Sequence, residues 1–451
     1  MKTENKTFLN NLISIAVPIS LQNLIQSCLG MIDQIMIGQL GSKTVAAVSL
    51  AGRPCFVMLF ALGGIAAASS IFAAQYEGAK DSSKHANVMR ASVFAALAVA
   101  LVFFIFSLFT PELVLSFFTK DTDVISIGKN YLMINSLSYF ALAIISCCSA
   151  MLRSTGFAKT PLVTGFISVA INTILNAIMI FGLLGFPALG SDGAAIATVI
   201  SIFVQCVILI VFMIKKNHPA NMKAVLLCKN DFSFLKIFFI TALPAIGNEL
   251  LWALGDAGYS AIYGHMGTAE LAAVTLTFPM QGLTIGFFSG LSAATGILIG
   301  NELGSNNFDK GYRLAWKFIK ICVLGCAVIG IFIFIFAPIY INFYNVEPQV
   351  REYAKHLLWI FAFYLWIKVC NMIIGNGILR SGGKTKFTLF LDLLGTYGIG
   401  LPLGLLGALV FKFEITKVYA LLSVEEIARL VIGAARVKSR KWIDNITHKN
   451  N

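Results

Sequence analysis

Twelve long apolar runs divide this chain of 451 residues, and they constrain its fold more than any other feature. Each run can cross a bilayer, because a helix needs ~20 apolar residues to span the hydrocarbon. The runs are solid, whereas strands of a membrane barrel alternate apolar and polar residues. We therefore predict an all-α integral membrane protein with spans near 11–37, 44–75, 87–109, 125–152, 160–182, 190–214, 234–262, 270–301, 313–336, 350–379, 386–411 and 414–435.

The composition supports this fold and sets its orientation. Hydrophobic residues make up 58% of the chain, charged residues 12%, and the net charge is +13. The basic residues lie between apolar runs, which favours inner loops of a membrane protein over binding to nucleic acid. The side that holds the N-terminus carries 24 Lys and Arg, and the other side carries seven. We expect a multi-pass protein of the cell membrane with both termini in the cytoplasm.

A repeat with an offset of 226 residues joins the two halves of the chain. It begins in PISLQNLIQSCLGMIDQIMIGQLG at 18–41 and PAIGNELLWALGDAGYSAIYGHMG at 244–267. Prolines and glycines coincide in the pairs Pro18 and Pro244, Gly38 and Gly264, and Gly41 and Gly267. QYEGAKD at 75–81 likewise matches NELGSNN at 301–307, and LRSTGFAK at 152–159 matches LRSGGKTK at 379–386 with one residue slipped.

Six spans separate the two copies, so both copies run through the membrane in the same direction. The halves are then related by a pseudo-two-fold axis along the membrane normal. We predict an N-terminal six-helix bundle at 1–214, a cytoplasmic linker at 215–233, and a C-terminal six-helix bundle with a basic cytoplasmic tail at 234–451. A doubled chain with an acid inside its first span is typical of a transporter.

That acid is Asp33, five residues before Gly38 at the outer turn. It lies ~8 Å below the turn, where a carboxylate is costly and usually faces a cavity. A proton or Na⁺ would neutralise it, and the alternative is a structural hydrogen bond within its own helix or to a neighbouring helix. Asn172 and Asn176 share one face of span five, and their carbonyls suit Na⁺, although asparagine often only links membrane helices. Thr198 in span six is a candidate hydroxyl ligand.

The second half carries different polar residues. Glu249 and Asp256 are seven apart on one face of span seven, and Tyr259 occupies the position equivalent to Asp33. We treat these three as a candidate polar site of the second bundle. In span two, Arg53 lies ~14 Å from the outer face, so it either pairs with Asp33 or extends to the surface.

No HExxH, GxSxG, P-loop or GxGxxG motif occurs in a suitable context. This argues against a membrane protease, a lipase and an ATP-driven pump, so we expect no enzyme activity and no organic cofactor. Energy must then come from an ion gradient.

The motifs together resemble those of the multidrug and toxic compound extrusion (MATE) family. They are MIDQIMIGQLG at 31–41, QYEGAKD at 75–81, LRSTGFAKTP at 152–161, NTILNAIMIFGLLGFPALGSDGAAIAT at 172–198, NELGSN and LRSGGKTK. The resemblance implies two six-helix bundles and efflux of cationic or amphipathic, drug-like molecules by alternating access in exchange for Na⁺ or H⁺. It maps a cation site onto Asp33, Asn172, Asn176 and Thr198.

Two departures from the family are visible. Some members carry Asp where this chain has Asn176, and the second-bundle acids of other members have no secure match here. We expect a monomer in the bilayer. The alternative function is a flippase for lipids or lipid-linked oligosaccharides of the wider superfamily. Such proteins tend to carry several Arg and Lys residues in their cavity, which bind pyrophosphate. Here only Arg53 and Lys368 are candidates.

Overall fold

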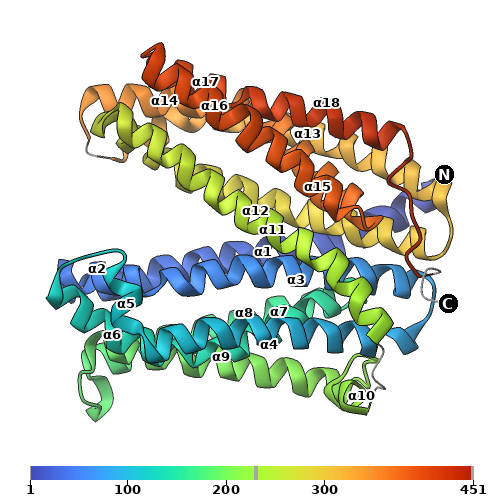
Figure 1. The fold of residues 1–451 in the computed structure, drawn as a ribbon, viewed down its shortest axis with the longest axis horizontal. Coiled ribbons are helices and arrows are strands. Elements are labelled where there is room, and N and C mark those ends of the chain that lie inside the picture. The colour runs from blue at the N-terminus through green and yellow to red at the C-terminus, as the bar shows by residue number, and fades with distance from the viewer. Residues whose placement is uncertain (1, 228–231, 345, 448–451) are drawn as a thin grey trace. The chain divides into compact units, whose positions relative to one another are not determined.

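The computed structural model describes residues 2–227, 232–344 and 346–447, and every regular element in those ranges is a helix (Figure 1). Within them, ten helices are long and apolar enough to cross a membrane. The pair Thr122–Ser136 and Ser138–Ser154 is apolar enough as well but bent by 46°, and it adds an eleventh when the two helices are counted as one span. The all-α prediction is therefore confirmed. The last predicted run, 414–435, forms two shorter helices that meet at Ser423.

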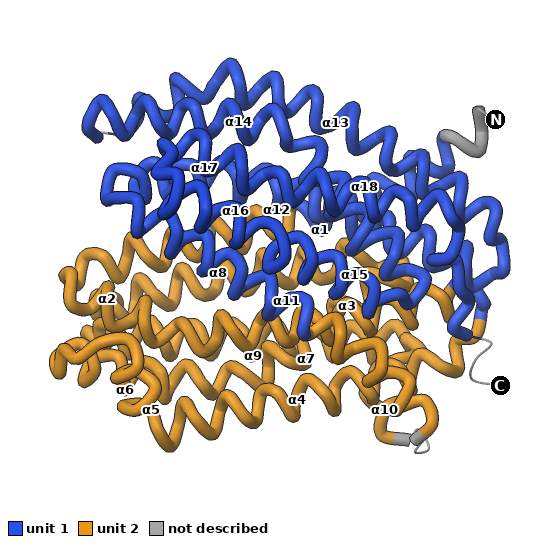
Figure 2. Tube along the Cα trace, turned by 45° about the horizontal axis from the view of Figure 1, so that its top comes forward, with its two compact units in different colours: residues 1–20, 78–80, 247–451 blue, residues 21–77, 81–246 orange. Residues whose placement is uncertain are grey.

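The helices form two compact units (Figure 2). Unit 2 comprises residues 21–77 and 81–246, and unit 1 comprises residues 1–20, 78–80 and 247–451. The helices of unit 2 are α2 (Ser42–Ala51), α3 (Arg53–Gly78), η1 (Ser82–Lys84), α4 (His85–Phe109), α5 (Pro111–Ser116), α6 (Thr122–Ser136), α7 (Ser138–Ser154), α8 (Lys159–Phe181), η2 (Leu183–Gly185), α9 (Gly190–Lys215) and α10 (Met222–Leu227).

Unit 1 contains three π-helical segments in addition to its α-helices. Its elements are α12 (Thr268–Gly304), α13 (Phe308–Asn342), α14 (Pro348–Met372), η3 (Ile373–Leu379), α15 (Thr385–Asp392), η4 (Leu393–Gly400), α16 (Leu401–Leu405), η5 (Leu406–Val410), α17 (Ile415–Leu422) and α18 (Val424–Lys438). The remaining two helices, α1 (Lys2–Gly38) and α11 (Phe232–Met266), contribute residues to both units.

The units differ from the predicted bundles at the start of each half. Unit 1 includes residues 1–20 of α1, and unit 2 includes α11 up to Ile246. The two changeovers, after Ser20 and after Ile246, are 226 positions apart, which is the offset of the sequence repeat. The first part of α1 therefore belongs to unit 1, with the second half of the chain, and the first part of α11 belongs to unit 2, with the first half. The predicted linker 215–233 includes α10, and its residues 228–231 lie outside the described part.

Equivalent glycines explain this exchange. In unit 2, a Cβ on Gly64 of α3 would lie 2.5 Å from the backbone of Ile246. In unit 1, a Cβ on Gly290 of α12 would collide with Ser20 Oγ and the carbonyl of Ala16. Gly64 and Gly290 are also 226 positions apart. Small residues let membrane helices approach backbone to backbone, so these glycines fasten the exchanged segments.

We predict that Gly64→Ala destabilises the protein while Gly63→Ala does not. The added methyl at position 64 meets main-chain atoms of α11 that cannot move aside, whereas a Cβ at position 63 meets nothing within 4 Å. Overpacking of this kind costs about 1–3 kcal/mol. The measurement is the thermal unfolding midpoint of each purified variant in detergent. Equal midpoints for the two variants would contradict this account of the packing.

Equivalent turns of the repeat contain residues with positive φ angles at equivalent positions. Gly41 and Gly267, which precede α2 and α12, have φ angles of +99° and +155°, which side chains with a Cβ rarely adopt. Lys80 and Asn306, in the matching inner turns, have φ angles of 57° and 60°. The sequence repeat is therefore a repeat of local structure.

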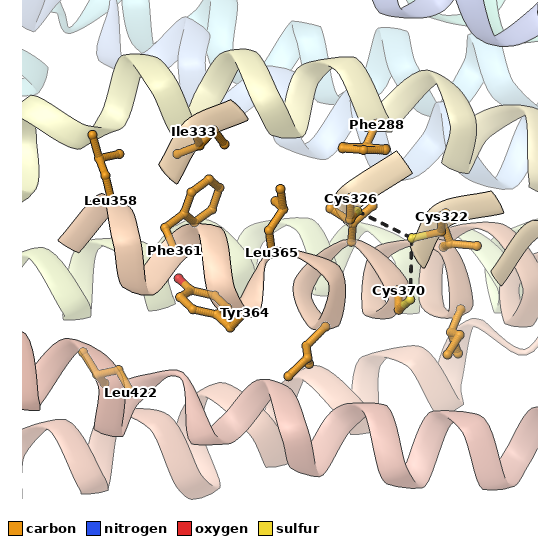
Figure 3. Close-up of a cluster of buried hydrophobic side chains, with 14 of the residues drawn as sticks. Phe288, Cys322, Cys326, Ile333, Leu358, Phe361, Tyr364, Leu365, Cys370 and Leu422 are labelled. Atoms are coloured by element: carbon orange, nitrogen blue, oxygen red, sulfur yellow. Dashed lines mark hydrogen bonds between the residues drawn. The ribbon is translucent and has the colours of Figure 1, made fainter. Parts of the chain in front are cut away.

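Unit 1 is built around a large apolar core that includes three cysteines (Figure 3). Cys322 Sγ lies 3.9 Å from Cys326 Sγ and 3.5 Å from Cys370 Sγ, packed among side chains such as Phe288. The predicted basic tail also packs into this unit, because Trp442 is fully buried and Lys384 Nζ lies 2.8 Å from Asp444 Oδ2. Residues 448–451 of that tail lie outside the described part.

Candidate functional site

One hydrogen-bonded chain in unit 2 joins the four polar residues predicted for the first bundle, and we call it the Asp33 site. Asn176 Nδ2 donates to Asp33 Oδ1 at 2.7 Å and to Asn172 Oδ1 at 3.0 Å. Asn172 Nδ2 donates to Thr198 Oγ1 at 3.2 Å. Both asparagines are 1% exposed, whereas Asp33 and Thr198 are half-buried. The structure thus brings all four together, and their binding of a cation stays a prediction.

Helices α1, α8 and α9 position the Asp33 site. Asn172 and Asn176 are one turn apart on α8, so they point from the same face. The small residues at the start of α9 let it approach α8 closely, since a Cβ on Gly193 would lie 2.6 Å from the carbonyl oxygen of Met179. Thr198 follows in the second turn after Gly193 and also donates to the carbonyl of its own helix.

Apolar side chains close one end of the site. Ile37, Ile180 and Ala194 each lie one helical turn from a member of the Asp33 site and belong to one buried cluster. They lie toward the same end of the bundle, because α9 runs opposite to α1 and α8. Tyr131 of α6 is part of the same cluster. The site is thus separated by an apolar layer from the turn at Gly41.

The Asp33 site contains several oxygen atoms that can bind a cation, and no described Lys, Arg or His pairs with its carboxylate. No ion pair joins Asp33 to a Lys, Arg or His in the described part of the chain. Asn176 Oδ1 is buried and has no hydrogen-bond partner. A hard cation prefers carboxylate, amide and hydroxyl oxygens, which are the groups present here. A proton on Asp33 would neutralise the site equally.

The described residues offer no alternative cation centre of the transition-metal kind. No group of three or more His, Cys, Asp or Glu suited to a metal occurs among them. Of the two alternatives for Arg53, pairing with Asp33 or extension to the surface, the pairing is not formed. Arg53 begins α3 directly after the break at Gly52, and its side chain is exposed. Asp33 is therefore left to its asparagine partner.

In unit 1, Glu249 belongs to an arginine clamp. Arg380 Nη1 and Nη2 both donate to Glu249 Oε1 at 3.0 Å, and Nη2 also donates to Asn248 Oδ1. The first half has a counterpart, since Arg153 Nη1 donates to Gln22 Oε1 at 3.5 Å. Gln22 of α1 and Asn248 of α11 are 226 positions apart. The arginine of each LRS motif therefore donates a hydrogen bond to the equivalent position in the first helix of its own half. This indicates a structural role for Glu249.

Tyr259, equivalent in position to Asp33, belongs to a second ion network in unit 1. Its Oη donates to Glu425 Oε2 at 2.6 Å. Arg429 Nη2 lies 3.6 Å from Glu425 Oε1, and Arg429 Nη1 lies 3.2 Å from Asp392 Oδ1. Asn248 also donates to Asp392, which connects this network to the arginine clamp. Two arginines of unit 1 therefore pair with three of its carboxylates, those of Glu249, Asp392 and Glu425.

Asp256 lies apart from Glu249, in a small cavity of about 80 Å³. Lys368 and Glu426 line the same cavity, with Lys368 Nζ 3.9 Å from Glu426 Oε1. Asn371 Nδ2 donates to Glu426 Oε2 at 2.8 Å. Tyr259 and Glu425 line this cavity too, so Asp256 and Tyr259 share one set of neighbours, whereas Glu249 belongs to the arginine clamp.

Sequence reasoning missed the polar residues of α18. Glu425, Glu426 and Arg429 lie within five positions of each other in the last predicted span. Three ionisable residues so close together in an apolar run are a signal of a buried ion network. Their partners, however, come from residues up to 166 positions away, which no local pattern reveals.

Comparison with known proteins identifies the family. A family model described as MatE matches residues 18–178 and again 244–406, and the two matches begin 226 residues apart. The uncharacterized transporter YisQ of Bacillus subtilis is 25% identical over 98% of this chain and 96% of its own length. The probable multidrug resistance protein NorM of Thermotoga maritima is 24% identical over 98% of this chain and 94% of its own.

Solved structures share the fold. A MATE transporter crystallised in a bent conformation matches with a TM-score of 0.86 at 19% identity, covering 96% of each chain. The outward-facing conformation of a multidrug resistance MATE transporter of the MOP superfamily matches with a TM-score of 0.85 at 18% identity, again over 96% of each. These matches confirm the predicted two-bundle, twelve-helix fold. The chain therefore belongs to the MatE family, the multidrug and toxic compound extrusion transporters.

Proposed function

We propose that this protein is a secondary active exporter of cationic or amphipathic small molecules, driven by inward movement of Na⁺ or H⁺. Family membership and relatives that are named as multidrug resistance proteins support this function. The observation that carries the coupling is the Asp33 site: a carboxylate in a membrane helix with an amide partner, no ion pair to any described residue, and a buried unpartnered oxygen beside it. Such a site changes its charge when a cation arrives.

Coupling requires that the cation favour one conformation over the other. Helix α1 is the element that we propose to respond, because Asp33 lies in its second part and residues 1–20 belong to unit 1. Pro18 lies inside α1 two residues before the changeover between units. Proline removes a backbone hydrogen bond, so α1 bends there at lower cost than elsewhere. A cation at Asp33 would thereby bias how α1 connects the units.

The flippase alternative lacks the cations that it needs. Arg53 is exposed at the start of α3, and Lys368 lies beside Glu426. Neither of the two candidates for pyrophosphate binding is thus set in a cluster of cations. We infer from the 24-to-7 bias of basic residues that both termini are cytoplasmic and that export runs outward from the basic side.

The function is tested by dye transport into inside-out vesicles that contain this protein. A Na⁺ gradient and a pH gradient are imposed separately, and uptake of ethidium is followed by fluorescence. We expect one of the two gradients to drive uptake above that of vesicles without the protein. Uptake that equals the background under both gradients would overturn the proposed function.

A further inference from the structure

The chain folds back on itself directly after the last helix of each half, α9 in the first and α18 in the second (Figure 1). The second residue after each helix, Asn217 or Arg440, has a positive φ angle of 46° or 59°. Such an angle ends a helix and turns the chain. A ring is buried within the next two residues, because His218 is 3% exposed and Trp442 is fully buried. Each segment therefore packs into the unit of the helix that it follows.

In the first half, His218 contacts the turn that follows the LRS motif. Ala220 N donates to His218 Nδ1 at 3.1 Å, so the proton of the neutral ring lies on Nε2. Nε2 donates to Thr155 Oγ1 at 2.9 Å, and this hydroxyl donates to the carbonyl of Met151 in α7. Burial and the nearby His85 lower the pKa of His218 to about 4, so the ring keeps this neutral form at pH 7.

In the second half, the tail contacts the equivalent turn. A Cβ on Gly382 would lie 1.9 Å from the carbonyl oxygen of Trp442, so only glycine fits there. Two residues further along the turn, Lys384 Nζ lies 2.8 Å from Asp444 Oδ2. The first contact falls on the same position of the motif in both halves, since Thr155 and Gly382 each follow the motif arginine by two residues.

The two turns also close in the same way. Phe157 N donates to the carbonyl of Leu152 at 2.8 Å, and Lys384 N donates to the carbonyl of Leu379 at 3.2 Å. These bonds join the sixth and first residues of LRSTGFAK and of LRSGGKTK. The glycine at the fifth position has a φ angle of 88° in the first motif and 70° in the second. A closure of this kind ends a helix, so the arginine at the second position lies at a fixed helix end.

Each motif arginine contacts its first helix at an equivalent place. The arginine bonds to Gln22 and Asn248 lie two residues beyond the changeover between the units. They also lie four residues after Pro18 of α1 and Pro244 of α11. A proline removes one backbone hydrogen bond, so each helix opens here at lower cost than elsewhere. The arginines are therefore placed to restrain this opening.

We propose that segments 216–221 and 439–447 are latches, which fix the LRS turn of their own half and thereby keep its arginine on the first helix beside the proline. The buried ring of each latch is a positioning residue, because it acts through the motif arginine. For α1, the latch would set how readily the helix responds to a cation at Asp33. Only this consequence rests on the proposed function.

Hydrogen exchange of the full-length protein in detergent, followed by mass spectrometry, tests the first latch. Peptides from residues 14–26 and 240–252 report local opening of α1 and α11. Thr155→Val removes the hydroxyl that His218 contacts, and loss of one hydrogen bond shifts a local opening equilibrium by about fivefold. We expect the α1 peptides to exchange about fivefold faster than in the wild type and the α11 peptides to be unchanged.

Two variants control for the hydroxyl. Thr155→Ser keeps it and should exchange like the wild type. Thr110→Val removes a matched hydroxyl, because Thr110 and Thr155 both end a helix of unit 2 and both donate to the carbonyl four residues before them. Thr110→Val should leave the exchange of α1 unchanged.

The opposite pattern is expected for the tail. Trp442→Ala removes the buried ring that seats the tail, whereas Trp442→Phe keeps an aromatic ring there. Trp442→Ala should speed exchange of the α11 peptides and leave the α1 peptides unchanged, and Trp442→Phe should have a smaller effect. Asp444→Asn, which removes the charge that pairs with Lys384, replaces Trp442→Ala if that variant does not fold.

Three results would overturn the proposal. Unchanged exchange of α1 in Thr155→Val would show that the turn does not restrain the first helix. Equally fast exchange in Thr155→Ser or Thr110→Val would exclude the contact with His218 as the cause. Faster exchange of both first helices in each variant would reflect a general loss of stability. The expected pattern in a protein without gradient-driven dye uptake would support the latches and count against the proposed export alone.

Discussion

Asp33→Asn is expected to abolish ion-driven export while the protein stays folded. The asparagine keeps an oxygen that accepts the 2.7 Å hydrogen bond from Asn176, so the packing of α1 on α8 is preserved. It loses the charge that a proton or Na⁺ would neutralise. In coupled systems, one ligand changes the affinity for the other by about 5- to 150-fold, and this factor should fall to one. Dye uptake into inside-out vesicles under the active gradient measures the loss.

The control for this variant is Asp309→Asn. Asp309 is 73% exposed and pairs with Arg440 in unit 1, so its loss removes one carboxylate without touching the Asp33 site. It should transport dye at the wild-type rate. Undiminished gradient-driven transport by Asp33→Asn would remove Asp33 from the mechanism.

Arg429→Ala is expected to destabilise unit 1 strongly. The Arg429 side chain is 12% exposed and lies between Asp392 and Glu425, which are 27% and 7% exposed. Its removal leaves the buried Glu425 and the half-buried Asp392 without their cation, and breaking a buried ion pair in this way costs about 3–5 kcal/mol. A lower thermal unfolding midpoint in detergent, relative to wild type, measures the effect.

A second change separates charge from packing in this network. Adding Glu425→Gln to Arg429→Ala removes one of the two unpaired carboxylates, while the glutamine still accepts the hydrogen bond from Tyr259. The double variant should recover part of the lost stability. If Glu425→Gln gives no recovery, the cost of Arg429→Ala comes from the cavity that it leaves and not from unbalanced charge.

Local patterns were enough to single out the polar residues of the Asp33 site, and the resemblance to the MATE family grouped them into one site. Asn172 and Asn176 share a helix face by their spacing of four, and the depth of Asp33 follows from its distance to Gly38. The repeat was visible for a similar reason, because the turns at Gly41 and Gly267 both have positive φ angles, which favour glycine. These inferences depend on residues close in the sequence, where helix geometry fixes relative positions.

Long-range packing set the remaining features. The exchange of residues 1–20 and 234–246 between the units depends on contacts between α12 and α1 and between α3 and α11, which span more than 180 positions. The partners of Glu249 and Tyr259, Arg380 and Glu425, lie 131 and 166 positions away. The spacing of Glu249 and Asp256 places them on one face of a helix, but it does not predict which residues of other helices contact that face.

The central claim is that one cation at the Asp33 site sets the affinity for the exported molecule, and a binding measurement tests it most directly. Ethidium binding to the purified protein is followed by fluorescence anisotropy while Na⁺ concentration and pH are varied separately. The account predicts that one of these cations weakens dye binding to the wild type and that Asp33→Asn binds dye equally at all concentrations of that cation. Cation-dependent dye binding that persists unchanged in Asp33→Asn would contradict it.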